Sequence, residues 1–471
     1  MKRIVLRERT LIPPFGEPAR DLRVLNKPLW LLQRDLLSPY CRGALEVDSL
    51  TEIPPDREEL LVHRDNLFFN EALISAFVAQ AKSGARACQI AFARTDKSIT
   101  AHALLLQEGI RLDPQRDVYL ADLFYYPNGV GDEPEPLLID TQSREMGYYH
   151  IPSYMARHGD LVYQVPLRAF LSIESWVHLF LANSPFGVFQ WGRAHEQLVE
   201  NSWKEKILVS LTTLADKLNP LVPRWRNHFL ASSRLVKIGK NCSIDPTATI
   251  HGPTVIGNNV NIGAGVTITN SLIGDNVTIM QGSQVMLSVV SDRCYLPFNA
   301  GLFMTSLMEN TMVAQLSCLQ MCVVGRNTFI GAGNIFTDFH LRGQPIRTFH
   351  QFRGAEKPEL VDVGLPVLGS AVGHNVKIGS GFVFYPARMV HSSTTMLYTA
   401  SDTAVARNVI HVPGDDDNEL DDNGEPHRTV YEWPRRVEPP ETPAHPPESQ
   451  RPPGRVEPLE MSLPAPVTLR H

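Results

Sequence analysis

The sequence predicts an α/β domain, followed by a parallel β-helix and then a disordered tail. Three observations support this order: strand-like and helix-like segments alternate at the start, isoleucines then recur every six residues, and an acidic run leads into a proline-rich end. We place the α/β domain at 1–193, a linking helix at 194–236, the β-helix at 237–412 and the tail at 413–471.

Composition excludes several classes of protein. The 471 residues include 44 Lys and Arg against 50 Asp and Glu, which gives a net charge of -6. No basic excess is available to neutralise phosphates, so we expect no nucleic-acid partner. No apolar run reaches the roughly 18 residues of a membrane span, and the first residues lack the apolar stretch of a signal peptide. Six scattered cysteines are typical of a reduced protein, so we expect a cytoplasmic location.

Alternating elements predict the first domain. Residues 1–7 and 89–93 have strand composition, and 59–69 has that of a strand running into a loop. Residues 28–37 are predicted to be helical, and 70–85 form a second predicted helix after an Asn cap. This alternation favours a mostly parallel sheet.

A period of six fits neither an α-helix nor a single strand, but it fits a three-sided coil whose isoleucines point inward and stack on one another. A loop at 341–366 is expected to leave the coil, and 291–311 fits the repeat poorly and indicates a second excursion. The predicted inward positions are Ile238, Ile244, Ile250, Ile256, Ile262, Ile268, Ile273, Ile279, Val285, Met312, Cys318, Val324, Ile330, Phe336, Val372, Ile378, Phe384 and Val390.

Four segments resemble a known family. They are NKPLWLLQRDLL (26–37), HRDNLFF (63–69), IGAGNIFTDFHL (330–341) and LGSAVGHNVKIGSGF (368–382). They are similar to the sugar-1-phosphate nucleotidyltransferases with a hexapeptide acyltransferase tail, such as the bifunctional N-acetylglucosamine-1-phosphate uridyltransferase/glucosamine-1-phosphate acetyltransferases. The resemblance implies a nucleotidyltransferase-like, Rossmann-like α/β domain and a left-handed β-helix. It also implies a transferase of nucleotide-sugar and cell-envelope precursor metabolism, with a sugar phosphate or nucleotide sugar as ligand.

The resemblance implies a nucleotidyl-transfer site in the first domain. Asp65 falls at the position of a Mg²⁺-binding aspartate, and Lys27 at that of a phosphate-binding lysine. The alternatives are a loop aspartate that caps a turn and a solvated lysine. The family's glycine-rich phosphate loop is replaced here by 10–23, with Gly16 as its one glycine, and its metal-binding D-x-G by Gln190-Trp191-Gly192. We therefore expect little or no sugar-nucleotide synthesis, because the donors that stabilise the leaving pyrophosphate are missing.

An acyltransferase site is implied at the end of the coil. The family's catalytic histidine before the I-G-A-G motif is absent, so His340 is predicted to be a displaced general base, with Asp338 orienting it. The loop that follows carries Arg342, Arg347 and Arg353, which we expect to bind the phosphates of acyl-CoA as co-substrate. The alternative for this loop is a solvated insertion without a ligand.

Two functions remain open. One is a transferase; the other is a catalytically inactive descendant that acts as a trimeric scaffold or a sugar-nucleotide sensor. In both cases we expect a homotrimer through 237–391. Its contact is expected to use apolar groups outside the repeat, namely Met280, Met286, Leu287 and the segment 304–312.

Overall fold

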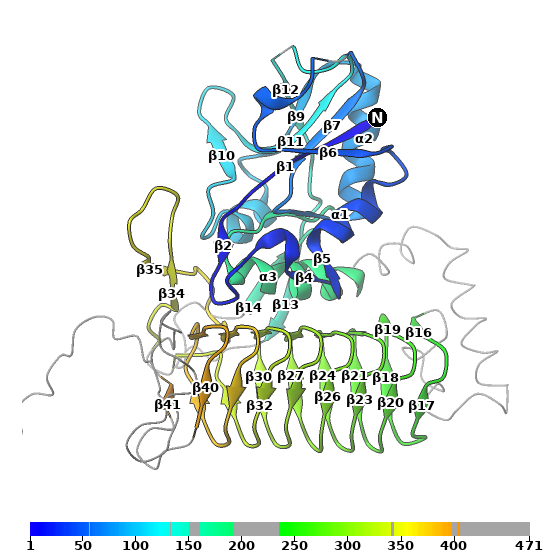
Figure 1. Ribbon diagram of the computed structural model, residues 1–471, viewed down its shortest axis with the longest axis vertical. Helices are drawn as coiled ribbons and strands as arrows, with labels where there is room; N and C mark the ends of the chain where they lie inside the picture. The colour runs from blue at the N-terminus through cyan, green and yellow to red at the C-terminus, as the bar shows by residue number, and fades with distance from the viewer. Residues whose placement is uncertain are drawn as a thin grey trace, which may run out of the picture. The chain divides into compact units, whose positions relative to one another are not determined.

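The computed structural model describes residues 1–55, 57–131, 133–149, 161–192, 235–340, 343–397 and 404–405. Figure 1 shows a sheet with helices built from the first part of the chain, and a stack of coils built from the later part. The predicted linking helix at 194–236 lies almost wholly outside the described residues. The predicted tail and Arg342 lie entirely outside them.

One sheet organises the first domain, in the order β12-β9-β11-β7-β1-β6, with β10 beside β11. β1 is parallel to β6 and β7, and β12 is parallel to β9. β11 is antiparallel to β7, β9 and β10, so the sheet is mixed, but its other strands share one direction, as a mostly parallel sheet was predicted to. The strands are β1 (Lys2–Leu6), β6 (Ala44–Val47), β7 (Leu60–Arg64), β9 (Cys88–Ala93), β10 (Ile110–Asp113), β11 (Val118–Tyr126) and β12 (Glu135–Leu138).

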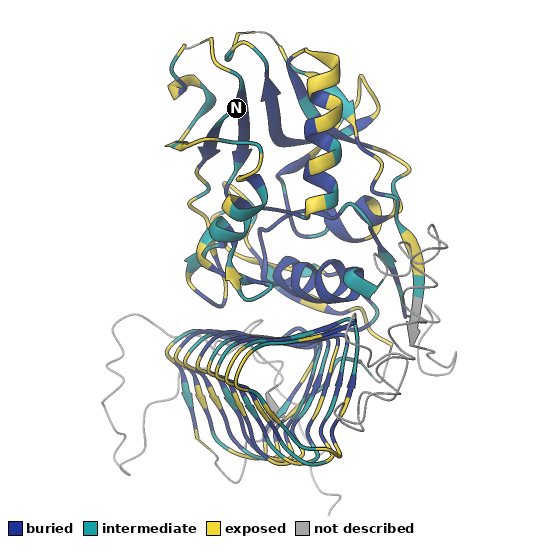
Figure 2. Ribbon diagram, turned by 90° about the vertical axis from the view of Figure 1, so that its right-hand side faces the viewer, coloured by how far each residue is buried: buried dark blue, intermediate teal, exposed yellow. Residues whose placement is uncertain are grey.

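The predicted helices are present as α1 (Leu29–Leu37) and α2 (Glu71–Gly84). The Asn70 side chain accepts the Leu73 N–H, which confirms the predicted cap. A third helix, α3 (Trp176–Asn183), is buried at every residue (Figure 2). The remaining elements are η1 (Ala19–Asp21), η2 (Leu50–Glu52), η3 (Ile99–Ala103), η4 (Ser184–Val188) and the pairs β2 (Leu11–Ile12) with β3 (Glu17–Pro18), β4 (Arg23–Val24) with β5 (Lys27–Pro28), β8 (Leu67–Phe69) with β15 (Phe170–Ser172), and β13 (Arg144–Tyr149) with β14 (Leu161–Val165).

The later part of the chain is a three-sided coil with a triangular cross-section in Figure 2. Each side is a parallel sheet of eight strands, and this arrangement fits a left-handed β-helix. Side A consists of β16 (Val236–Ile238), β19 (Thr254–Ile256), β22 (Leu272–Ile273), β25 (Val289–Val290), β28 (Ser306–Leu307), β31 (Val323–Val324), β36 (Ala371–Val372) and β39 (Met389–Val390). Side B consists of β17 (Ser243–Ile244), β20 (Asn261–Ile262), β23 (Thr278–Ile279), β26 (Tyr295–Leu296), β29 (Met312–Val313), β32 (Phe329–Ile330), β37 (Lys377–Ile378) and β40 (Thr395–Met396). Side C consists of β18 (Thr249–His251), β21 (Thr267–Thr269), β24 (Gln284–Met286), β27 (Gly301–Phe303), β30 (Cys318–Gln320), β33 (Ile335–Phe336), β38 (Val383–Phe384) and β41 (Ala404–Val405).

The isoleucine ladder is present where it was predicted. Ile250, Ile256, Ile262 and Ile268 are buried inside the coil. The expected excursion at 291–311 is wrong, because this segment forms regular strands on all three sides.

The number of residues per coil explains why 291–311 was wrongly predicted to leave the coil. Partners in neighbouring coils are 18 residues apart at Ile238 and Ile256, but 17 apart at Ile256 and Ile273 and in the coils that follow. One side is a residue shorter, so a strict period of six drifts out of register. Met312 and Cys318, predicted to point inward, are therefore only partly buried, and the next residues Val313 and Leu319 fill the core.

The predicted loop leaves the coil after side C and contains a hairpin, β34 (Arg347–His350) with β35 (Glu359–Asp362). Ile346, Val363 and Leu365 of this insertion belong to the core cluster of the α/β domain. None of the helices in the described part of the chain combines the length and the apolar composition needed to cross a membrane.

Candidate functional site

Charged side chains gather where the parallel strands of the α/β sheet end. The carboxyl ends of β1, β6, β7, β9 and β12 lie at one edge, because these strands share a direction. Ligands of open α/β sheets bind at this edge, near the point where the strand order reverses. Here that point lies at β1, which has the later strands β6 and β7 on its two sides.

Asp65 follows β7 at this edge, and its side chain is buried. One carboxylate oxygen accepts the Glu8 N–H at 2.8 Å, and the other accepts Arg20 Nη1 at 3.1 Å. Burial raises the pKa of Asp65 to about 6, although the Glu8 N–H and Arg20 act in the opposite direction. Arg20 also bonds Glu46 of β6. Within the described residues no group of three or more His, Cys, Asp or Glu side chains is arranged to hold a metal ion.

The segment at 10–23, which the resemblance predicted to replace a phosphate loop, contacts the coil of the same chain. The Ser392 hydroxyl lies 3.1 Å from the carbonyl oxygen of Pro14 and 2.9 Å from that of Phe15. Glu17 forms an ion pair with Arg326, and its carboxylate lies 3.6 Å from His374 Nε2. Burial raises the pKa of Glu17, but the bonds from His374 and Arg326 outweigh it and lower the pKa to about 2.

The other predicted phosphate ligands also have partners within the chain. Lys27 Nζ donates to Asp35 of α1 at 2.7 Å, and this pair is exposed. Arg353 of the insertion donates to Glu8 at 2.6 Å, and its guanidinium lies 3.9 Å from Glu174.

Contacts of the insertion anchor it on the α/β domain. The backbone N–H of Arg353 donates to Glu108, and the Trp176 indole donates to Thr348 of β34 at 3.2 Å. Arg347 is exposed and forms no ion pair with any described residue.

The predicted acyl-transfer residues lie at the end of the coil, at the root of the insertion. Burial raises the pKa of Asp338. Burial lowers the pKa of His340, and the nearby Arg388 guanidinium lowers it further. No hydrogen bond between Asp338 and His340 occurs in the described structure, so the expected orienting contact is not formed here. Leu368 donates its N–H to the Asp338 carbonyl oxygen at 2.8 Å, which ties the two ends of the insertion together.

Arg388 was not singled out from the sequence. Its pKa is lowered by burial, and its Nε is buried without a hydrogen-bond partner among the described residues. The sequence nevertheless contains a signal for Arg388. Strand residues before and after the insertion are register partners 48 positions apart, as Ile335 and Val383 are. The same offset connects His340 to Arg388, so aligning the coils across the insertion would have identified it.

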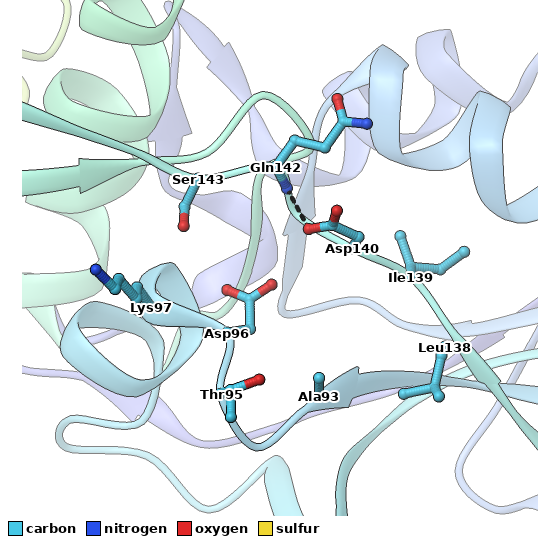
Figure 3. Close-up of a pocket in the computed structure, with 9 residues that line it drawn as sticks. All are labelled: Ala93, Thr95, Asp96, Lys97, Leu138, Ile139, Asp140, Gln142 and Ser143. Carbon is cyan, nitrogen blue, oxygen red and sulfur yellow. Dashed lines mark hydrogen bonds between the residues drawn. The ribbon is translucent and has the colours of Figure 1, made fainter.

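A further pocket, of about 460 Å³, lies beyond the ends of β9 and β12 (Figure 3). Asp96 lines this pocket. Its carboxylate accepts hydrogen bonds from the Thr141 hydroxyl and the Ser98 N–H, and these bonds connect the segments that follow β12 and β9. Lys97 and Asp140 stand in Figure 3 on opposite sides of this space. The sequence analysis missed this pocket, although an aspartate three residues after a predicted strand was a usable signal. Its lining residues are Ala93, Thr95, Asp96, Lys97, Leu138, Ile139, Asp140, Gln142 and Ser143.

Comparison with known proteins concerns the coil. Residues 235–270 match the family model described as bacterial transferase hexapeptide (six repeats). The coil therefore begins with hexapeptide repeats. A solved structure, the UDP-N-acetylglucosamine acyltransferase from Campylobacter jejuni, is similar at 17% identity and a TM-score of 0.19. The likeness covers 33% of this chain and 57% of that one, so the chain spans just over half the length of this relative. No curated protein matches the sequence.

Two separate groups contain four of the predicted site residues. The coil brings His340 close to Arg388, with Asp338 two residues away in the same segment. The α/β domain collects Asp65 and, through the insertion, Arg353, with Glu8 bonded to both. Lys27 bonds only Asp35 and belongs to neither group.

Proposed function

We propose that this chain is a hexapeptide-type transferase that takes acyl-CoA at the end of its coil and binds a sugar phosphate or nucleotide sugar in its α/β domain. The observation that carries the proposal is the proximity of the half-buried His340 to the guanidinium of Arg388, whose Nε has no hydrogen-bond partner among the described residues. An imidazole whose pKa lies below its ordinary value is neutral near pH 7, which is the form that a general base requires.

The proposed chemistry uses these two side chains differently. His340 accepts the proton of an attacking amine or hydroxyl while the nucleophile bonds to the thioester carbon. The carbon–sulfur bond then breaks, and the coenzyme A thiolate takes the proton back from the imidazolium. Arg388 supplies positive charge for a phosphate group, since no described carboxylate pairs with it and a guanidinium can bind an anion bidentately.

For the α/β domain we propose binding without nucleotidyl transfer and without Mg²⁺ at Asp65. The segment 10–23 bonds Ser392 and Arg326 and lies against His374 instead. Asp65 is bonded to Arg20, which competes with a cation for the same carboxylate.

A second function is favoured by the same ion pairs. Asp65, Lys27 and Arg353 each bond a residue of this chain, which is what a catalytically inactive descendant that senses sugar nucleotides or acts as a scaffold would show. Proteins of this kind bind a nucleotide sugar but release no coenzyme A.

Calorimetry with acetyl-CoA, combined with an assay of thiol release in the presence of amino-sugar phosphates, distinguishes the two. For a transferase we expect acetyl-CoA to bind, His340→Gln to retain binding while thiol release falls by about 10²–10⁴-fold, and Arg388→Met to weaken binding by roughly tenfold. Arg86→Met is the matched control, because this arginine is 75% exposed and pairs with Glu135 of β12 in the α/β domain. Absence of acetyl-CoA binding at millimolar concentration would rule out the acyltransferase and leave the inactive descendant.

A further inference from the structure

The pocket in Figure 3 lies apart from both groups of predicted site residues. It is formed where β9 and β12 end, and these strands run side by side, because Ala91 and Leu138 are register partners. β9, β11 and β7 separate the edge strand β12 from β1, where the strand order of the sheet reverses. Its volume of about 460 Å³ lies within the range of ~300–1,000 Å³ that is common for small-molecule sites. We therefore treat this pocket as a candidate site of its own.

Hydrogen bonds from the chain itself fix the shape of this pocket. One carboxylate oxygen of Asp96 accepts the N–H groups of Ser98 and Ile99, at 3.1 and 3.2 Å. The other oxygen accepts the Thr141 N–H at 3.2 Å and the Thr141 hydroxyl at 2.6 Å. Both oxygens of Asp96 thus already have donors, so this carboxylate shapes the pocket and is not its main ligand-binding group.

Two opposite charges line the pocket without an ion-pair partner among the described residues. Lys97 is exposed, and its ammonium group bonds no described residue. Asp140 is exposed as well, and Arg168 bonds its backbone carbonyl oxygen but not its carboxylate. The side chains of Lys97 and Asp140 stand on opposite sides of the space in Figure 3, and no ion pair joins them.

The backbone of the lining is strained beside one of these charges. Gln142 adopts a left-handed conformation with a φ angle of 51°, which is uncommon for a residue with a long side chain. Its N–H donates to an Asp140 carboxylate oxygen at 2.8 Å, so the strained turn also holds the Asp140 side chain in place. Strained backbone of this kind concentrates at ligand-binding sites. This observation is independent of the two charges.

An exposed apolar side chain completes the lining. Leu138 at the end of β12 is 54% exposed, and Ala93 and Ile139 line the pocket beside it. A ligand that covers Leu138 removes apolar surface from water, which favours binding. The pocket therefore offers a positive group, a negative group and an apolar surface.

We propose that this pocket binds a free α-amino acid with a large apolar side chain. Lys97 binds the carboxylate of the ligand, Asp140 accepts hydrogen bonds from its ammonium group, and its side chain covers Leu138. A ligand with only negative charge would meet the carboxylates of Asp96 and Asp140, and one with only positive charge would meet Lys97. A zwitterion satisfies both sides. The inference goes beyond the proposed function and does not depend on it, because no residue of either predicted group lines this pocket.

Isothermal titration calorimetry with L-leucine, on the full chain, tests the site. We expect leucine to bind with a Kd of about 1 mM or lower. Leucinamide lacks the carboxylate and isocaproate lacks the ammonium group, so each should bind at least about tenfold more weakly than leucine. Equal binding of the three compounds overturns the inference, and so does the absence of binding by leucine and phenylalanine at roughly 10 mM.

Two variants assign the charges separately. Lys97→Met should weaken leucine binding by about tenfold and remove the preference for leucine over leucinamide. Asp140→Asn should remove the preference for leucine over isocaproate, while its side-chain oxygen can still accept the Gln142 N–H. A role in folding alone would not remove one preference in each variant. If both variants keep both preferences, the inference is wrong even though leucine binds.

The matched control is Arg94→Met. Arg94 lies between the lining residues Ala93 and Thr95 but does not line the pocket, and its exposed guanidinium pairs with Asp117 at 3.0 Å. This variant should bind leucine as the unmodified chain does. An amino-sugar phosphate is also a zwitterion, so it serves as the competing ligand. If it binds more tightly than leucine and loses affinity in Lys97→Met and Asp140→Asn, the pocket is a sugar site and the inference is overturned.

Discussion

Three buried histidines show how single residues make this fold sensitive to acid. His178 accepts the N–H groups of Glu174 and Ser175 with Nδ1, so the imidazole is neutral. His102 likewise accepts the Gln164 N–H with Nε2 at 2.9 Å. Burial lowers the pKa of His63 and of His178 to about 3, and that of His102 to about 4.

The free energy of unfolding should therefore decrease as the pH falls below about 6.5, the ordinary histidine pKa. Below that pH these three histidines bind protons in the unfolded chain but stay neutral in the folded chain. Each histidine therefore lowers the free energy of unfolding by up to roughly 1.4 kcal/mol per pH unit. Asp65 and Asp338 act in the opposite direction, because burial raises the folded pKa of both, but these are two groups against three. Urea unfolding from pH 7.5 to 4.5 measures the slope. A constant free energy of unfolding across this range would contradict the assignment of neutral histidines.

At the scale of elements, a row of asparagines holds one corner of the coil. Asn259, Asn276, Asn310 and Asn327 all adopt positive φ angles between 54° and 58°. Asparagine tolerates this left-handed conformation better than other residues with a side chain. The side chains also bond along the row: Asn310 Nδ2 donates to Asn327 Oδ1 at 2.9 Å, and Arg293 Nε donates to Asn310 Oδ1.

Substitutions at Asn310 separate these two contributions. Asn310→Gly keeps the positive φ accessible and loses the side-chain bonds, so we expect a loss of about 1 kcal/mol in the free energy of unfolding. Asn310→Ala loses the same bonds and adds backbone strain, which should bring the loss to about 2 kcal/mol. Denaturant titration of both variants measures the difference. If the alanine variant were as stable as the glycine variant, the backbone conformation would contribute nothing.

This corner also shows the limits of the sequence analysis. The inward ladder was predictable because burial repeats with a fixed local spacing, and Ile250 and Ile262 are buried as predicted. The sequence analysis did not single out the asparagines at the corners. It placed Asp338 and His340 at the root of the insertion, but it missed Arg388. The contact between His340 and Arg388 joins neighbouring coils across an insertion. A period of six residues does not give the length of the insertion, so the period alone does not show that these two residues are neighbours.

At the scale of the whole described chain, ion pairs fasten the α/β domain to the coil. Arg23 and Glu309 are 286 residues apart in sequence, and Arg326 and Glu17 are 309 apart. No sequence motif predicts such contacts, because they depend on how the surface of the folded α/β domain fits the surface of the folded coil. They show what the segment 10–23 contributes: Glu17 and Arg23 bond the coil, and Ile12 and Phe15 are buried in the shared core.

A double-mutant cycle on Arg23 and Glu309 measures this docking. Burial raises the pKa of Glu309, but the Arg23 bonds outweigh it, so the carboxylate stays charged and depends on its partner. Arg23→Met leaves that charge partly buried and unpaired, which should cost roughly 1–3 kcal/mol of the free energy of unfolding. Arg23→Met/Glu309→Met removes both charges and should cost less than the sum of the single changes, by about 1–2 kcal/mol. Strictly additive losses in urea unfolding would mean that the pair does not stabilise the docked domain.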